Sequence, residues 1–134
     1  MSSIGHDFIL EMIHIKLKKM GYKLTCSESR YKDIKFAMPP TISHHRPDTI
    51  GYNNNSICIG EAKYYGDFNS QRSHTQIKDF IMLTKDNNIK VIFGFPLSER
   101  EKFFNILKKE KIELNSNIAL LEIPDRLIPK NEEK

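Results

Sequence analysis

The chain has 134 residues, 39% hydrophobic and 28% charged, the composition of a soluble protein with a single domain. No apolar run approaches the roughly 18 residues that a membrane-spanning helix needs, and the N-terminal apolar residues are too interrupted for a signal peptide, so we expect an intracellular, cytoplasmic protein without a membrane partner. The net charge of +4 is compatible with a polyanionic partner. The only cysteines, Cys26 and Cys58, lack the spacing of a zinc site or a disulfide framework and are expected to be buried free thiols.

The first third of the chain predicts one helix followed by short strands. Residues 6–20 place apolar side chains at mostly helical spacing, and Gly21 follows as a stop. Residues 22–27 and 34–38 have the apolar character of short strands, and a proline pair ends the second strand because proline cannot donate to a strand ladder. A polar loop, residues 41–46, comes next.

A hairpin is predicted within residues 46–66, RPDTIGYNNNSICIGEAKYYG. Asn54-Asn55 suit a two-residue turn because asparagine tolerates the positive φ angles that such turns require. With this turn, Tyr52 lies opposite Ile57, and the pairing can be followed to the open end of the hairpin. The two strands should therefore be in a fixed register over their whole length.

This register concentrates charge at the open end of the hairpin. Asp48 falls opposite Glu61, where Cβ atoms are about 4.5–5.5 Å apart, and Lys63 points to the same face as Glu61. Two carboxylates this close repel each other unless a cation lies between them. Magnesium is one such cation, and an ion-pair cluster without a metal is the alternative. The opposite face carries only small side chains, which would let another element pack closely: Thr49, Gly51, Cys58, Gly60 and Ala62.

The remaining elements alternate between helix and strand. Residues 75–85 predict a helix with Ser73 as its cap, and residues 90–95 form a nearly continuous apolar run, as in a buried central strand. Ser98, with a glutamate three residues later, has the capping-box pattern of another helix start. Residues 118–123 predict the last strand.

This order predicts an α/β fold in which a mixed sheet is flanked by helices. We expect a single domain over residues 1–124, without internal repeats. Residues 125–134 are polar and contain a proline, and we expect them to form a flexible tail.

The charged end of the hairpin resembles the signature of the PD-(D/E)xK nuclease superfamily. Pro47-Asp48 is followed, after twelve intervening residues, by Glu61-Ala62-Lys63. The resemblance implies a restriction-endonuclease-like core with a mixed central β-sheet in αβββαβ order, and it covers residues 5–95. In size and layout the chain is most similar to archaeal Holliday-junction resolvases.

The resemblance also implies a role for each matched residue. Asp48, Glu61 and the backbone carbonyl of Ala62 would bind Mg²⁺, for which Mn²⁺ could substitute. Lys63 would orient the attacking water or stabilise the charge that develops on the phosphate.

Two further positions match the superfamily less closely. Gln76, near the start of the following helix, would help to position Lys63 or a phosphate. Glu11, in the first helix, would complete the metal site, with His6 and Asp7 as competing candidates for this role.

Several cationic residues near the motif are candidate contacts to the DNA backbone, because phosphate binding requires cations without exact placement. They are Arg46, Arg72, His74 and Lys78. His44 and His45 precede the motif and belong either to a solvated loop or to the DNA-binding surface. The chain has no P-loop, GxSxG or GxGxxG element, so no nucleotide cofactor is expected.

The sequence thus predicts a Mg²⁺-dependent DNA endonuclease that hydrolyses phosphodiester bonds, with selectivity for branched DNA such as a Holliday junction. A restriction-like or end-processing nuclease is the alternative within the superfamily. Two rivals belong to other classes: a non-catalytic DNA-binding module on the same fold, and an unrelated α/β interaction protein with a chance motif.

We also expect a homodimer, because cutting both strands of a duplex or junction is most simply done by two sites related by a two-fold axis. The apolar residues left after the sheet is built belong either to its interface or to the core of the protein. They are Phe93, Phe95, Phe103, Phe104, Leu120 and Leu121.

Overall fold

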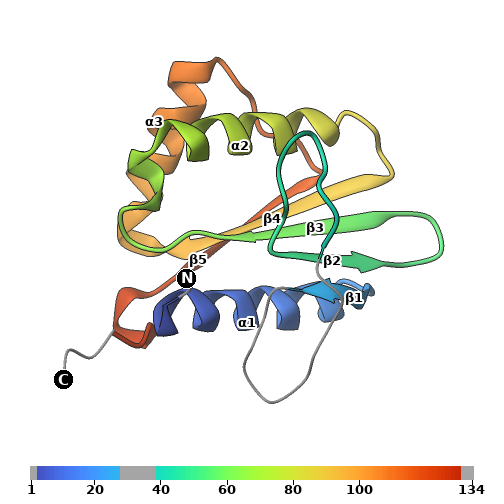
Figure 1. Cartoon of the computed structure of the whole chain (residues 1–134), viewed down its shortest axis with the longest axis horizontal. Helices are drawn as coiled ribbons and strands as arrows, with labels where there is room; N and C mark the ends of the chain where they lie inside the picture. Colours follow the sequence, from blue (N-terminus) through green and yellow to red (C-terminus); the bar gives the residue numbers. More distant parts are fainter. Residues whose placement is uncertain (1–2, 28–38, 131–134) are drawn as a thin grey trace.

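The structure is a computed structural model that describes residues 3–27 and 39–130. It is built on a five-stranded sheet, with helix α1 on one face and helices α2 and α3 on the other (Figure 1). The helices are α1 (Ile4–Lys19), α2 (Gln71–Leu83) and α3 (Arg100–Glu110). The strands are β1 (Lys23–Ser27), β2 (Thr49–Tyr52), β3 (Ile57–Ala62), β4 (Ile89–Pro96) and β5 (Ile118–Ile123). Short 3₁₀ turns are η2 (Asp67–Asn69), η3 (Leu97–Glu99) and η4 (Asp125–Leu127).

The sheet is mixed, and its strands lie in sequence order from β1 to β5. The pairs β1–β2 and β2–β3 are antiparallel, whereas β3–β4 and β4–β5 are parallel. The predicted α/β class with a mixed sheet is confirmed, and the order from α1 to β4 is the expected αβββαβ. The predicted strand at residues 34–38 lies outside the described residues. Among the described helices, none is long and apolar enough to cross a membrane.

Helix α1 packs on one face of the sheet because that face is made of small residues. The helix buries Ile9, Ile13 and Leu17 completely. A Cβ atom added at Gly60 would lie 2.7 Å from the Cγ2 atom of Ile13, and one at Gly94 would lie 2.9 Å from the Cδ1 atom of the same residue. The close approach that the small residues of the hairpin predicted is therefore confirmed.

The opposite face carries an aromatic core beneath α2 and α3. Phe93, Phe95 and Phe103 are fully buried in it. The ring centroid of Phe103 lies 5.4 Å from that of Phe93 and 5.1 Å from that of Phe95. These three residues stabilise the folded chain itself, so the prediction that they supply a dimer interface is wrong. Phe104 is half-buried against the same core, under the guanidinium of Arg100 at 4.7 Å.

The hairpin has the predicted register, but its turn is held by a different interaction. Tyr52 pairs with Ile57, as expected. Among the described non-glycine residues, positive φ angles occur only at Ser43, His44 and Lys111, so the turn asparagines do not adopt them. Instead, the side-chain oxygen of Asn53 accepts hydrogen bonds from the backbone N–H groups of residues 55 and 56 at 2.9 and 2.8 Å.

Both predicted helix caps differ from the observed ones. Helix α2 begins four residues earlier than predicted, and its cap is Ser70 rather than Ser73: the Ser70 hydroxyl accepts a hydrogen bond from the Ser73 N–H at 3.1 Å. The predicted capping box at Ser98 does not form. Helix α3 has Glu99 as its N-cap residue without a side-chain cap bond, while the N–H of Ser98 donates to Asp125 at 3.0 Å.

Two further expectations are corrected by burial. The segment predicted as a tail from residue 125 packs against the body of the protein over residues 125–130, since Ile128 is buried beside α1 in the core. The prediction for residues 131–134 lies outside the described residues. Of the two cysteines, Cys58 is buried as expected and Cys26 is only half-buried.

Candidate active site

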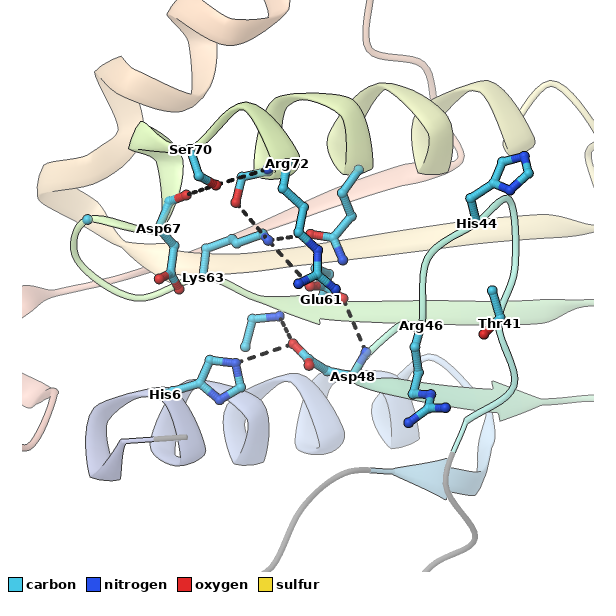
Figure 2. Close-up of a pocket in the computed structure, with 14 residues that line it drawn as sticks. His6, Thr41, His44, Arg46, Asp48, Glu61, Lys63, Asp67, Ser70 and Arg72 are labelled. Carbon is cyan, nitrogen blue, oxygen red and sulfur yellow. Dashed lines mark hydrogen bonds and ion pairs between the residues drawn. The ribbon is translucent and has the colours of Figure 1, made fainter. Parts of the chain in front are cut away.

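A cavity of about 640 Å³ opens where the antiparallel and parallel halves of the sheet meet. Its walls come from α1, the entry to β2, the end of β3, the start of α2 and the loop at residues 41–46 (Figure 2). Its lining residues are His6, Thr41, His44, Arg46, Asp48, Glu61, Ala62, Lys63, Gly66, Asp67, Ser70, Arg72, Ser73 and Gln76. Most of the motif residues identified in the sequence thus reach a single cavity.

The carboxylates of Asp48 and Glu61 lie on neighbouring strands and are fixed by reciprocal hydrogen bonds. The N–H of Asp48 donates to Glu61 Oε1 at 3.1 Å, and the N–H of Ala62 donates to Asp48 Oδ2 at 2.9 Å. Both acidic residues are buried, with 8% and 4% of their surface exposed. The second oxygen of each carboxylate takes no part in these two hydrogen bonds.

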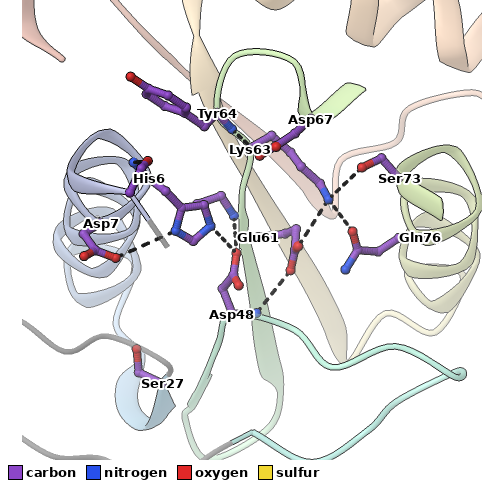
Figure 3. A network of polar contacts seen from close by, with 12 residues as sticks. His6, Asp7, Ser27, Asp48, Glu61, Lys63, Tyr64, Asp67, Ser73 and Gln76 are labelled. Carbon is purple, nitrogen blue, oxygen red and sulfur yellow. Dashed lines mark hydrogen bonds and ion pairs between the residues drawn. The ribbon is translucent and has the colours of Figure 1, made fainter. Parts of the chain in front are cut away.

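The ammonium group of Lys63 is held between Glu61 and helix α2. Its Nζ atom lies 3.5 Å from Glu61 Oε2, donates to the Ser73 hydroxyl at 3.2 Å, and also donates to Gln76 Oε1 (Figure 3). Lys63 is 6% exposed. A flexible side chain is therefore held in one position by three partners, next to the carboxylate pair.

The first helix brings His6 to this site, not Glu11. His6 Nε2 lies 3.4 Å from Asp48 Oδ2, whereas Glu11 is not among the described residues that line the cavity. The two positions are five residues apart, which is about 140° around a helix with 3.6 residues per turn. Asp7 lies beside His6, with 3.9 Å between its Oδ1 atom and His6 Nδ1. Of the three candidates for the first-helix position, the structure therefore favours His6.

The pKa values of the site show that its charges act on one another. Burial lowers the pKa of His6, but its hydrogen bond to Asp48 and the charges of Asp48, Glu61 and Asp67 outweigh this effect and raise the pKa to about 9. Burial raises the pKa of Glu61, and the charge of Asp48 raises it further, while Lys63 lowers it. Additional positive charge at this point would favour the ionised form of Glu61.

The oxygen ligands that this site can offer suit a magnesium ion better than a metal whose ligands all come from the protein. Among the described residues, no group of three or more His, Cys, Asp or Glu side chains is arranged to hold a metal ion. Asp48, Glu61 and the Ala62 carbonyl would give only three hard oxygen ligands. This number suits Mg²⁺, which keeps several waters and is commonly bound by one or two carboxylates together with substrate phosphate.

The cations predicted to contact DNA divide into two groups. Arg46 and Arg72 line the cavity. His74 instead forms a hydrogen bond with the backbone carbonyl of Phe68, with 2.8 Å between its Nε2 atom and that oxygen. The Nζ atom of Lys78 lies 3.9 Å from the Oε1 atom of Glu110, the last residue of α3. Neither His74 nor Lys78 is among the described lining residues.

Four polar residues that line the cavity were not identified from the sequence as site residues: Thr41, Asp67, Ser70 and Ser73. Ser73 lies three residues before Gln76, so helical spacing places both on one face, and this signal could have revealed it. Asp67 follows Gly66, which has a φ of 84°, and its Oδ2 atom accepts a hydrogen bond from the Tyr64 N–H at 2.7 Å. The position of Asp67 depends on this tight turn, for which the sequence has no clear signal.

Comparisons with known proteins show distant structural similarity. No protein-family model and no curated protein sequence matches the chain. The chain is similar to an fdxN element excision controlling factor protein from Anabaena variabilis, with 14% identity, a TM-score of 0.49 and coverage of 93% of this chain and 98% of that one. An XisH family protein from Nostoc punctiforme is similar with 12% identity, a TM-score of 0.48 and the same coverage.

A third similar structure is Pyrococcus furiosus SfsA in complex with Ca²⁺, with 16% identity and a TM-score of 0.49. The match covers 86% of this chain but only 52% of SfsA, so the chain corresponds to about half of that protein.

Proposed function

We propose that the protein is a Mg²⁺-dependent DNA endonuclease that hydrolyses phosphodiester bonds. The observation that carries this proposal is the convergence of Asp48, Glu61 and Lys63 in one open cavity, with the lysine fixed by hydrogen bonds. Buried charges are costly unless they are paired and hydrogen-bonded. Groups with perturbed pKa values in a cleft are typical of functional sites. The resemblance of these residues to the PD-(D/E)xK signature supports the same chemistry.

The metal would be held by Asp48, Glu61 and the carbonyl of Ala62, with Mn²⁺ able to replace Mg²⁺. When bound, the ion would polarise the scissile phosphate and lower the pKa of the attacking water. The backbone N–H groups of Asp48 and Ala62 already fix the orientation of the two carboxylates, so binding the ion would need little rearrangement.

Lys63 would provide the second positive charge of the site. Ser73 and Gln76 hold its ammonium group, so its position costs little reorganisation when negative charge develops on the phosphate oxygens. Because Lys63 is buried, such an electrostatic contact is stronger than it would be in water. Gln76 would therefore act as a positioning residue through Lys63.

His6 would take the position of the acidic first-helix residue. It approaches the Asp48 oxygen that also accepts the Ala62 N–H, and so it constrains the orientation of that carboxylate. The other Asp48 oxygen stays available for a cation. His6 is thus a positioning residue rather than a metal ligand in this proposal.

For the substrate, we propose DNA, with a branched structure such as a four-way junction as the first candidate and restriction-like or end-processing activity as the second. One observation favours a non-catalytic DNA-binding module instead. Each carboxylate already has a cationic neighbour, His6 beside Asp48 and Lys63 beside Glu61, so the cluster can be electrostatically balanced without a metal.

The deciding experiment is incubation of the protein with end-labelled duplex, flap, four-way junction and single-stranded DNA, in Mg²⁺ or in EDTA. We expect Mg²⁺-dependent cleavage of at least one substrate. Asp48→Asn and Glu61→Gln, purified in parallel, should bind DNA without cutting it, which also controls for contaminating nucleases. Binding without cleavage by the unaltered protein would favour the DNA-binding module.

A further inference from the structure

The loop at residues 41–46 forms one wall of the cavity and has an unusual backbone. Ile42 and His45 pair with each other through two hydrogen bonds, N–H to carbonyl, of 2.6 and 2.9 Å. Between them, Ser43 and His44 both have positive φ angles, 50° and 70°. Left-handed backbone at a non-glycine residue carries a conformational cost and persists only where the surrounding structure enforces it.

A buried contact to helix α2 holds this loop in place. His45 Nε2 donates to Asp79 Oδ2 at 2.8 Å, and the His45 ring packs edge-on against Phe80 with centroids 5.8 Å apart. His45 is 8% exposed, and Ile42 packs against the aromatic core. The loop is thus anchored at both sides of its turn, although its tip faces the cavity.

The anchored loop contributes basic side chains to the lining of the cavity that holds the carboxylate pair. His44 and Arg46 are exposed and line the cavity, as does Arg72 from the first turn of α2 (Figure 2). Among the described residues, none of these three has a salt-bridge partner. Cationic side chains that line a cleft without an acidic partner are available to a polyanionic ligand.

The distance from the loop to the carboxylates is set by the chain itself. Arg46 precedes Asp48 by two residues, which span at most about 7 Å of backbone. A nucleic-acid strand rises about 3.4 Å per nucleotide. Allowing for the length of the arginine side chain, a phosphate held at Arg46 would lie within a few nucleotides of a scissile phosphate bound at the Asp48–Glu61 site.

We propose that residues 41–46 are a preformed binding loop for a backbone phosphate close to the scissile one, with His44 and Arg46 as its contacts and the His45–Asp79 pair as its anchor. This proposal rests on the proposed function for the position of the scissile phosphate. A rigid loop binds with less loss of conformational freedom than a mobile one. Phosphate contacts carry no direct sequence information, so the loop would strengthen binding to DNA of any sequence.

The test measures the dissociation constant for a fluorescent duplex by anisotropy in Ca²⁺, over a series of salt concentrations. Arg46→Ala should weaken binding about fivefold, the upper range for one exposed ion pair, and lower the salt slope by about 0.9. His44→Asn should weaken binding to a smaller degree, since asparagine tolerates the same backbone conformation. Lys108→Ala on α3 removes an exposed cation far from the loop and should change neither quantity.

The anchor is tested by a double-mutant cycle between Arg46→Ala and Asp79→Ala, with thermal unfolding as a check on folding. If Asp79 acts through the loop, the double variant binds about as weakly as the weaker single variant. Strictly additive losses, or Arg46→Ala with unchanged affinity and salt slope, would overturn the proposal. Cleavage is assayed separately. If the protein cuts DNA but the substitutions do not change its DNA affinity, the binding loop is refuted and the nuclease proposal stands. If the two substitutions are coupled but the protein does not cut DNA, only the nuclease proposal is refuted.

Discussion

At the scale of single residues, Lys63 is the group whose role depends most on its surroundings. It comes from the end of β3, but two of its hydrogen-bond partners belong to α2. A lysine is ordinarily mobile and strongly hydrated, and its position here is fixed by burial and by three neighbours. Its proposed contribution is therefore to the chemical step rather than to substrate binding.

The first prediction follows from this position. Lys63→Ala should lower the single-turnover cleavage rate by about 100-fold or more, as loss of one preorganised electrostatic contact does in other enzymes. DNA affinity should change little, because exposed cations dominate backbone binding. Lys102→Ala, an exposed lysine on α3, is the control. Equal rates for both variants would contradict the role given to Lys63.

A second prediction separates His6 from Glu11. His6→Ala should slow single-turnover cleavage by about tenfold, since a hydrogen bond to a charged group contributes about 1.5–3 kcal/mol. His6→Gln should recover part of this loss, because its amide can donate to the same Asp48 oxygen. Glu11→Gln should have little effect. If Glu11→Gln were the slower variant, the acidic first-helix role would belong to Glu11 after all.

The residues of the site differ in how well the sequence predicts them. The sequence alone predicts that Asp48, Glu61 and Lys63 lie close together, because the hairpin register fixes the positions of all three. His6 could not be chosen over Glu11, since the side of α1 that faces the cavity depends on how the whole helix packs. The loop conformation at Ser43 and His44 has no local signal either, because neither residue type favours positive φ as glycine does.

At the scale of elements, the packing of α1 on the sheet is the most constrained interface. Gly51, Gly60 and Gly94 all lie where an added Cβ atom would meet a side chain of the helix at 2.4–2.9 Å. The sequence predicted this close contact from the small residues of one hairpin face. It did not predict the start of α2, because two serines could cap that helix and the choice depends on the preceding turn.

The third prediction tests this interface at Gly60. A Cβ atom there would lie 2.5 Å from Thr49 Cγ2 and 2.7 Å from Ile13 Cγ2, so Gly60→Ala should destabilise the protein by about 1–3 kcal/mol. Thr49→Ser removes one of the two clashing atoms and keeps the hydroxyl that donates to the Cys26 carbonyl. The double variant should therefore lose less stability than the two single changes combined. Strict additivity in chemical denaturation would show that the two positions do not touch.

At the scale of the whole molecule, β5 is the feature that bears on assembly. Within the described residues it is an edge strand that pairs with β4 alone, and its first five residues are half-buried. Natural proteins ordinarily protect such edges with charge, proline or a covering element. Of the residues considered for the dimer interface, Phe104, Leu120 and Leu121 are only partly buried, although each of them packs against the core.

The fourth prediction is that the protein forms a homodimer in solution with its two cavities on one face. Two-fold dimers are the commonest soluble assembly and would match the two strands of a junction. Sedimentation combined with light scattering at micromolar concentration, with and without four-way junction DNA, measures the mass. A monomer under both conditions would make a nicking or end-processing enzyme the better description.

The bonds at Asp125 have a consequence for chain synthesis. The cavity is built from residues 6–76, but Tyr65, just beyond Lys63, donates its hydroxyl to Asp125 at 2.6 Å, and Ser98 binds the same carboxylate. During synthesis, the segment that follows Lys63 therefore lacks this partner until a further 60 residues have been made. A chain truncated before Asp125 would carry every motif residue but not these hydrogen bonds. The contacts of Asp125 thus make the segment next to the cavity depend on a part of the chain that is made after all the motif residues.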